Sequence, residues 1–395
     1  MDRTLRHAAP ALALALAVAA CAGPVTGPAP AAARLAHPAE TLNQLQAISA
    51  VTNTPLFESF TVLAPRFTPA SAPGSVALAA LDFAARYSPW QRGEPRTAHH
   101  AVSFTGPATP PTMPGTTFVW DPATAGYVAS SDSGAPANGE RFVLYALSQR
   151  TGLPSIPLVI TGYVDLTVPP SDSSGAGVTL VGTPAAGPVT TYASYSVATG
   201  AASATTLAGF LSDGTTRLDL DVRTDSTTTP GALTVRSAID VPSQNVQVSE
   251  SVTVSGGDTA RMTTDLRLTS GGETVRAMGD VTIDTTSRIG TGRMTVSVNN
   301  CPFATLTLGG PDLVFAAAHG VTLSAADETT LRALFSTSFE LYGTVRLLLL
   351  PQQRGLRAPA ALTLRSLGNV CTSDRGSGGR GGGRFARCRA RFEGE

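Results

Sequence analysis

Lysine is absent from the whole chain, and its 28 basic residues are all arginine. Several enzyme classes are therefore excluded, because a P-loop needs a lysine on its phosphates and pyridoxal-phosphate enzymes need a lysine for the Schiff base. Protein kinases and Ser-Lys hydrolases are excluded for the same reason. The 28 acidic residues balance the arginines. Without a net charge to attract polyanions, we expect no specific nucleic-acid partner.

Motifs of metal and hydrolytic enzymes are also missing. The sequence contains no C-x-x-C, H-E-x-x-H or G-x-S-x-G motif, so nothing nominates a zinc site, a redox dithiol or a serine nucleophile. An enzyme remains a third hypothesis only if histidines gather with a carboxylate in one cleft, and the candidates are His37, His99, His100 and His319. We expect no metal, no cofactor and no enzymatic activity.

The N-terminus has the pattern of an export signal. Arg3 and Arg6 precede a short apolar run that ends in Val18-Ala19-Ala20-Cys21. This ending resembles the lipobox of bacterial lipoproteins, which implies that residues 1–20 are a signal peptide and that Cys21 is the site of lipid attachment. Residues 21–36 then form a Pro/Ala-rich tether. The resemblance implies an exported protein anchored by its acylated N-terminus in the bacterial cell envelope, on the periplasmic or the surface face. Secretion after cleavage at a nearby small residue is the alternative.

The remaining cysteines are odd in number. Removing Cys21 leaves Cys301, Cys371 and Cys388 in a compartment that is expected to be oxidising. Cys301 and Cys371 are the preferred disulfide pair because both adjoin well-patterned segments, whereas Cys388 lies in a glycine- and arginine-rich tail. The other pairings stay open, because spacing alone does not decide connectivity.

Apolar spacing divides the rest of the chain into helices and strands. Residues 39–51, 75–87 and 324–336 have the spacing of amphipathic helices, and Ser324 is expected to cap the third, with Asp327 and Glu328 in its first turn. Strands are expected near residues 116–121, 127–130, 141–147, 158–168, 178–182, 189–198, 204–211, 341–350 and 361–367. Residues 169–177 are interpreted as a flexible connection.

The clearest pattern runs from Thr216 to Leu308. Apolar and polar residues alternate with a period of two, as they do when one face of a sheet is buried and the other meets water. The segment SGGDT at residues 255–259 recurs as SGGET at residues 270–274, and both glycine pairs suit tight hairpin turns. This region is therefore predicted to be an antiparallel meander.

These elements predict a mainly β, α+β protein. Residues 37–370 are expected to form one β-rich domain, a large antiparallel meander shaped as a half-barrel or open curved sheet that packs on N- and C-terminal helices. Residues 371–395 are expected to be a disordered Gly/Arg-rich tail. The architecture, over residues 140–350, is similar to the half-barrel carriers of periplasmic lipoproteins. More broadly, TTFVWDPATAGYV and GAPANGERFVLYAL resemble uncharacterised exported bacterial lipoproteins, which carry over no activity.

Glu250 is the exceptional residue of the meander, because strict alternation places it on the aliphatic face. A carboxylate there is costly unless it is paired or faces a cavity. Either it contacts a ligand in a cavity, or a bulge near Ser249 turns it outward. The first hypothesis is a non-enzymatic envelope lipoprotein that binds a lipid or another apolar ligand on a concave face that includes Val246, Val248, Glu250, Val252, Leu266 and Leu268. The second is a structural or adhesive surface protein with a packed core and no ligand. The oligomeric state is not indicated.

Overall fold

The computed structural model describes residues 33–67, 113–168, 175–183, 188–199, 204–227, 232–256, 259–284, 289–309 and 312–351. The chain divides into one unit of residues 1–356 and another of residues 357–395, and all described residues belong to the first. The predicted signal peptide, Cys21, the predicted helix at 75–87, the predicted strand at 361–367 and the C-terminal tail lie outside the described residues.

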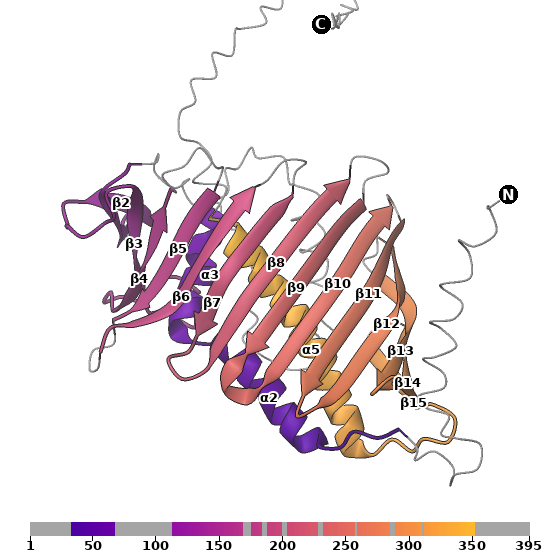
Figure 1. Ribbon diagram of the computed structural model, residues 1–395. Coiled ribbons are helices and arrows are strands. Elements are labelled where there is room, and N and C mark those ends of the chain that lie inside the picture. The colour runs from indigo at the N-terminus through magenta and orange to yellow at the C-terminus, as the bar shows by residue number, and fades with distance from the viewer. Residues whose placement is uncertain are drawn as a thin grey trace, which may run out of the picture. The chain divides into compact units, whose positions relative to one another are not determined.

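The described residues form one open sheet of 15 strands, shown in Figure 1. Its order is β15-β14-β13-β12-β11-β10-β9-β8-β7-β6-β5-β4-β3-β1-β2, so from β3 to β15 each strand pairs with the strand that follows it in sequence. Every pairing is antiparallel except that of β1 with β3, which is parallel. The strands are β1 (Thr116–Asp121), β2 (Gly126–Ser130), β3 (Gly139–Tyr145), β4 (Ile160–Thr167), β5 (Gly175–Gly182), β6 (Thr190–Thr199), β7 (Thr205–Ser212), β8 (Arg217–Thr227), β9 (Ala232–Val241), β10 (Val246–Gly256), β11 (Thr259–Ser270), β12 (Glu273–Asp284), β13 (Ile289–Val298), β14 (Cys301–Gly309) and β15 (Asp312–Ala317).

The predicted α+β class with an open antiparallel sheet is confirmed. The expected strands up to residue 308 are present, and β5 begins at Gly175, so the end of the segment interpreted as a flexible connection is strand. The SGGET turn joins β11 to β12, with Gly271 at φ 56° and Gly272 at φ 83°. Both positive φ values belong to the left-handed region that glycine enters without steric cost, which explains the glycine pair. Residues 257–258 of the SGGDT turn are outside the described residues.

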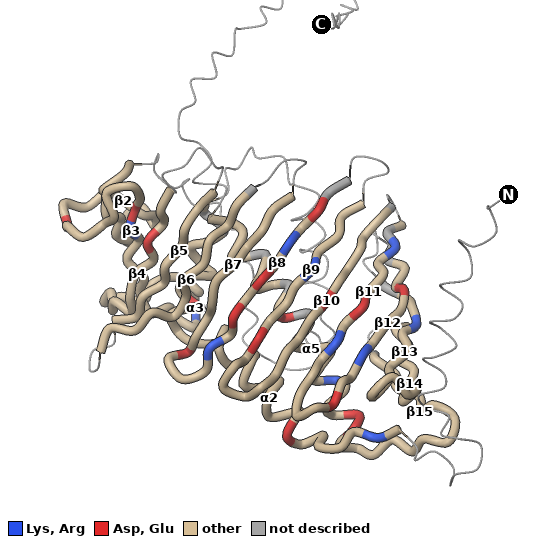
Figure 2. The backbone as a smooth tube through the Cα atoms, viewed as in Figure 1, with Lys and Arg blue, Asp and Glu red and all other residues tan. Residues whose placement is uncertain are grey.

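The two faces of the sheet differ in chemistry because side chains alternate along each strand. On β8, Leu218, Leu220 and Val222 are buried, whereas Arg217 and Asp221 are exposed. Figure 2 shows acidic and basic residues along β8, β9, β11 and β12. We call the aliphatic side of the sheet the inner face and the charged side the outer face.

The α-helices of the described residues lie on the inner face: α2 (Pro38–Val51), α3 (Pro55–Leu63) and α5 (Ala325–Leu349) (Figure 1). Short 3-10 turns, η1 (Ala64–Phe67) and η4 (Pro242–Gln244), complete the described elements. The expected helix at 39–51 is confirmed as α2. Helix α3 was not predicted, although Thr54 caps it by accepting a hydrogen bond from the Phe57 amide and Pro55 opens its first turn.

Helix α5 corrects one expectation. It begins as predicted, because the Ser324 hydroxyl accepts a hydrogen bond from the Asp327 amide and the Asp327 carboxylate binds the Ser324 amide in return. However, the helix runs to Leu349 rather than to residue 336, so the strand predicted at 341–350 is wrong. Val345, Leu348 and Leu349 are buried at helical spacing. Packing of this stripe on the sheet continues the helix.

Helices from the two ends of the domain pack together. The Thr330 hydroxyl on α5 donates to the Pro38 carbonyl at 2.8 Å, and the Ser49 and Thr337 hydroxyls lie 3.5 Å apart. Polar contacts also join the helical layer to the sheet: the Ser270 hydroxyl of β11 donates to Gln44 of α2 at 2.6 Å. The core therefore lies between the inner face and a layer made from residues 38–63 and 325–349.

Candidate functional site

All six residues predicted for a ligand face lie on the inner face and are buried: Val246, Val248, Glu250, Val252, Leu266 and Leu268. They come from the neighbouring strands β10 and β11, where Glu250 stands opposite Leu266 and Val248 opposite Leu268. Their common face confirms the alternation from which they were chosen, whereas their role in binding stays a prediction.

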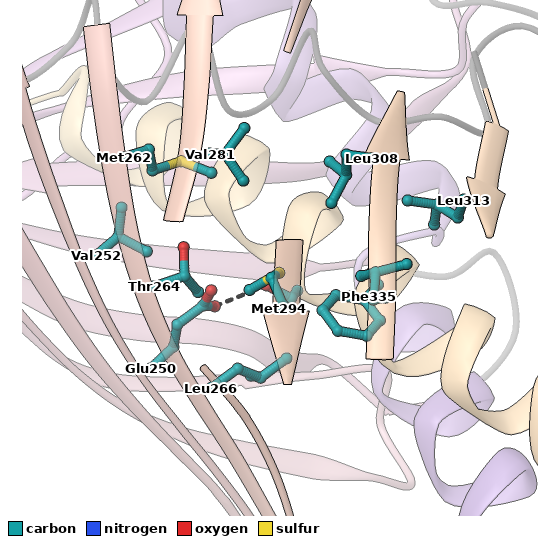
Figure 3. Close-up of a pocket in the computed structure, with 12 residues that line it drawn as sticks. Glu250, Val252, Met262, Thr264, Leu266, Val281, Met294, Leu308, Leu313 and Phe335 are labelled. Carbon is teal, nitrogen blue, oxygen red and sulfur yellow. Dashed lines mark hydrogen bonds between the residues drawn. The ribbon is translucent and has the colours of Figure 1, made fainter. Parts of the chain in front are cut away.

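A small cavity lies between this part of the inner face and α5. It has a volume of about 20 Å³ and is lined by Glu250, Val252, Met262, Thr264, Leu266, Val281, Met294, Leu306, Leu308, Leu313, Phe335 and Ser338. Three of the predicted residues, Glu250, Val252 and Leu266, belong to this lining. Figure 3 shows Glu250 and Thr264 projecting into the cavity from the sheet, with Met294 and Phe335 facing them.

One row of inner-facing residues crosses the strands at the cavity. The strand register places five residues opposite one another on β10 to β14: Val252, Thr264, Gly279, Met294 and Leu306. Four of these line the cavity, whereas Gly279 does not. The space beside Gly279 is filled, because a Cβ at that position would lie 2.6 Å from Cα and 2.9 Å from Cγ of Met294.

Glu250 is 7% exposed and points inward, so the alternative of an outward turn near Ser249 is wrong. The register of β10 with β9 and β11 runs through this position without a bulge. The Ser338 hydroxyl of α5 donates a 2.7 Å hydrogen bond to the carboxylate Oε2. This bond offsets part of the cost of burying the carboxylate, and it ties the helix to the sheet.

Thr264 is the second polar residue that β strands contribute to the cavity. It is 5% exposed, and its Oγ1 has no hydrogen-bond partner among the described residues. Thr264 stands opposite Val252, one step along the inner face from the pair formed by Glu250 and Leu266. Its hydroxyl and the Glu250 carboxylate therefore occupy one small, mostly apolar space.

Another buried hydroxyl shows that the inner face is not uniformly apolar. Tyr195 on β6 lies among aliphatic residues, and its hydroxyl also has no partner in the described part of the chain. Burial raises the pKa of Tyr195 well above its ordinary value, because the charged phenolate loses its hydration. Tyr195 does not line the cavity, so it is a packing feature of β6.

The ligand face predicted from the sequence left out most of the remaining lining. Alternation along the meander places Met262 on the same face as Leu266 and Leu268, although it was not assigned to the ligand face, and Thr264 shares this parity. By contrast, no sequence signal places Phe335 and Ser338 over these strands, because the docking of a helix on a sheet depends on tertiary packing.

The outer face carries ion pairs between arginine and aspartate, some between neighbouring strands and others within β8. Arg276 of β12 binds Asp265 of β11 at 2.7 Å, and Arg261 binds Asp280 at 2.8 Å. The hydrogen bond from Arg276 lowers the pKa of Asp265, and the bond from Arg261 lowers the pKa of Asp280. These side chains lie in water, so they form a solvated face and not a buried charged site.

The other candidates do not gather into a site in the described residues. His37 precedes α2 and His319 is exposed in a turn, while His99 and His100 are outside the described residues. The described residues contain no cluster of three or more His, Cys, Asp or Glu suited to a metal ion. Cys301, which opens β14, is disulfide-bonded, and its predicted partner Cys371 lies outside the described residues.

A comparison with known protein families, with curated proteins and with solved structures finds no match. No helix in the described part of the chain has the length and apolar character needed to cross a membrane.

Proposed function

We propose that this chain is a non-enzymatic lipoprotein of the bacterial cell envelope that binds a lipid or another apolar ligand between the inner face of its sheet and α5. The observation that carries the proposal is the mostly apolar cavity beneath α5, which lies on the strands where the predicted ligand face was placed. The lipobox-like segment ending at Cys21 supports attachment to a membrane by N-terminal acylation.

The contacts between α5 and the sheet above the cavity are ones that an apolar ligand chain could take over. Leu331, Leu334 and Phe335 are buried on α5. Their contacts with the sheet are hydrophobic, so they require that water is excluded but no particular geometry. A ligand chain inserted beneath the helix restores the same type of contact. Met262 and Met294 also line the cavity, and methionine adapts its shape readily to different occupants.

The cavity of about 20 Å³ holds roughly one water molecule, whereas pockets for small ligands usually measure about 300–1,000 Å³. On this proposal the structure is the closed state of the protein, and ligand binding requires α5 to move away from β10–β14. Gly343 lies within α5, where glycine lowers helix stability by about 0.5–1 kcal/mol relative to alanine. This position favours bending of the helix.

The proposal is tested with the full chain carrying Cys21→Ser, so that no acyl chain is attached covalently. The protein is purified without detergent, incubated with vesicles of phosphatidylethanolamine and phosphatidylglycerol, and examined by native mass spectrometry and lipid extraction. Bound lipid supports the proposal. A lipid-free mass both before and after incubation overturns it.

A pair of variants localises the bound lipid. Val252→Phe adds volume to the cavity lining and is expected to abolish uptake, at a cost of about 1–3 kcal/mol for overpacking. Val314→Phe makes the same change at an exposed position of β15 and is expected to bind lipid normally. Circular dichroism checks that both variants fold. Equal uptake by both variants would place the ligand elsewhere.

The second candidate is a structural or adhesive surface protein with a packed core. The small size of the cavity favours it, because such a core needs no ligand space. In that case Val252→Phe only destabilises the fold, and no variant binds lipid.

A further inference from the structure

We infer that Thr264, with Glu250 and Ser338 beside it, forms a polar recognition point that selects an apolar ligand bearing a neutral hydroxyl group. This inference rests on the proposed function and specifies the chemical class of its ligand. The three side chains converge on one cavity from β10, β11 and α5, as Figure 3 shows for the two strand residues. All the other residues that line it are apolar.

The unpartnered hydroxyl of Thr264 is the observation that points to a ligand. A hydroxyl buried without a hydrogen bond is costly, and the majority of buried side-chain polar atoms have a partner. Thr264 is 5% exposed, lines the cavity, and finds no partner among the described residues. The cavity beside it has room for one non-hydrogen atom of a polar group.

The chemistry of the three groups decides what that atom can be. An ionised carboxylate only accepts hydrogen bonds, whereas a threonine hydroxyl both donates and accepts. The Ser338 hydroxyl already donates its hydrogen bond to Glu250 Oε2. A ligand hydroxyl matches this set, because it can accept a hydrogen bond from Thr264 and donate a hydrogen bond to the Glu250 carboxylate.

Other ligand head groups match less well. A fatty acid brings a carboxylate that has no proton to donate to Glu250, and its own oxygens would be buried among apolar residues with the Thr264 hydroxyl as a donor. A plain hydrocarbon leaves the Thr264 hydroxyl unpartnered. An alcohol with an apolar body therefore binds better than either the acid or the alkene of the same chain length.

The experiment compares 1-dodecanol, 1-dodecene and dodecanoate with the full Cys21→Ser chain, by native mass spectrometry and titration calorimetry. We expect dodecanol to bind about tenfold more tightly than dodecene, which corresponds to one hydrogen bond at the strong end of the neutral range, and dodecanoate to bind more weakly than dodecanol. Adding Thr264→Val, which keeps the shape but removes the hydroxyl, should make dodecanol bind like dodecene. Thr224→Val is the matched control, because Thr224 is also buried on the inner face but does not line the cavity.

The outcomes separate this inference from the proposed function. If dodecene and dodecanol bind equally and Thr264→Val changes neither, the inference fails while apolar binding stands. The inference also fails, while apolar binding stands, if the hydrogen-bond partner of the Thr264 hydroxyl is a water molecule and not the ligand. If none of the three compounds binds, the proposed function itself fails. A dodecanol preference that is lost in Thr264→Val and kept in Thr224→Val supports the inference.

Discussion

Ser338 of α5 and Glu250 of β10 join the helical layer to the sheet, by a hydrogen bond of 2.7 Å between residues 88 positions apart. Because the bond is buried and one partner is a carboxyl group, removing the donor leaves a desolvated acceptor with less compensation. Ser338→Ala should lower the free energy of unfolding by about 1–3 kcal/mol, measured by urea denaturation. Ser336→Ala on the same helix is the control, since the Ser336 hydroxyl is half-buried and bonds Glu340 at 3.4 Å. Equal effects of the two changes would contradict the prediction.

Removing the Thr264 hydroxyl is expected to stabilise the fold, whereas removing the Ser338 hydroxyl destabilises it. Its hydroxyl is buried without a partner in the described residues, so replacing it by a methyl group removes a desolvated polar atom. Thr264→Val in the ligand-free chain should raise the free energy of unfolding by about 1 kcal/mol. Thr224→Val should bring no such gain, because the Thr224 hydroxyl donates to the Thr205 carbonyl at 3.5 Å. A loss of stability in Thr264→Val would show that a water or ligand already satisfies this hydroxyl.

The outer face should make stability depend on pH. The hydrogen bond from Arg276 lowers the pKa of Asp265 below its ordinary value of 3.8, so this carboxylate stabilises the fold above that value and loses its effect as the pH falls through the lowered pKa. Asp265 is exposed over 40% of its side chain, and the effect is therefore limited to a few tenths of a kcal/mol by solvent screening.

The test compares urea midpoints of the native sequence and Asp265→Asn at pH 6 and at pH 2.5. The native sequence should lose slightly more stability than the variant on acidification. High salt should reduce the difference. Asp221→Asn, at an exposed position of β8, controls for the removal of a charge from the same face. An identical acid response of the native sequence and Asp265→Asn would rule out a contribution from this pair.

Membrane attachment through Cys21 has a direct test. In a bacterial host that processes lipoproteins, the unaltered chain should enter the membrane fraction and carry the extra mass of its acyl groups, because more than one acyl chain anchors a protein stably. Cys21→Ser should move it to the soluble fraction without that mass. Cys388→Ser controls for the loss of a cysteine. An unmodified mass for the mature native chain would leave simple secretion as the correct alternative.

The strands of the meander were predictable because their signal is local. Leu218, Leu220 and Val222 alternate with charged residues, and this period of two specifies both the strand and the face that is buried. The same logic placed Glu250 on the inner face. Its partner Ser338 was not predictable, because nothing local in the sequence says which strand a helix will cover.

The C-terminal half of α5 shows where local patterns fail. Residues 347–350 are four consecutive leucines, and a continuous apolar run has no period that distinguishes a helix from a strand. The capping box at Ser324 marked the start of the helix but not its end. The parallel pairing of β1 with β3 was also beyond the sequence, since no local pattern says which strand will pair with the free edge of β1.

The strand order has a consequence for how the chain assembles. From β3 to β15 every strand joins its neighbour in sequence, so the sheet can grow one hairpin at a time with short loops to close. The contact between Pro38 and Thr330 spans 292 positions and belongs to the helical layer. Because closing such a long loop is entropically costly, we expect this contact to form after the strands have paired. The helical layer is thus expected to pack on the sheet last, after the strands have paired through local contacts.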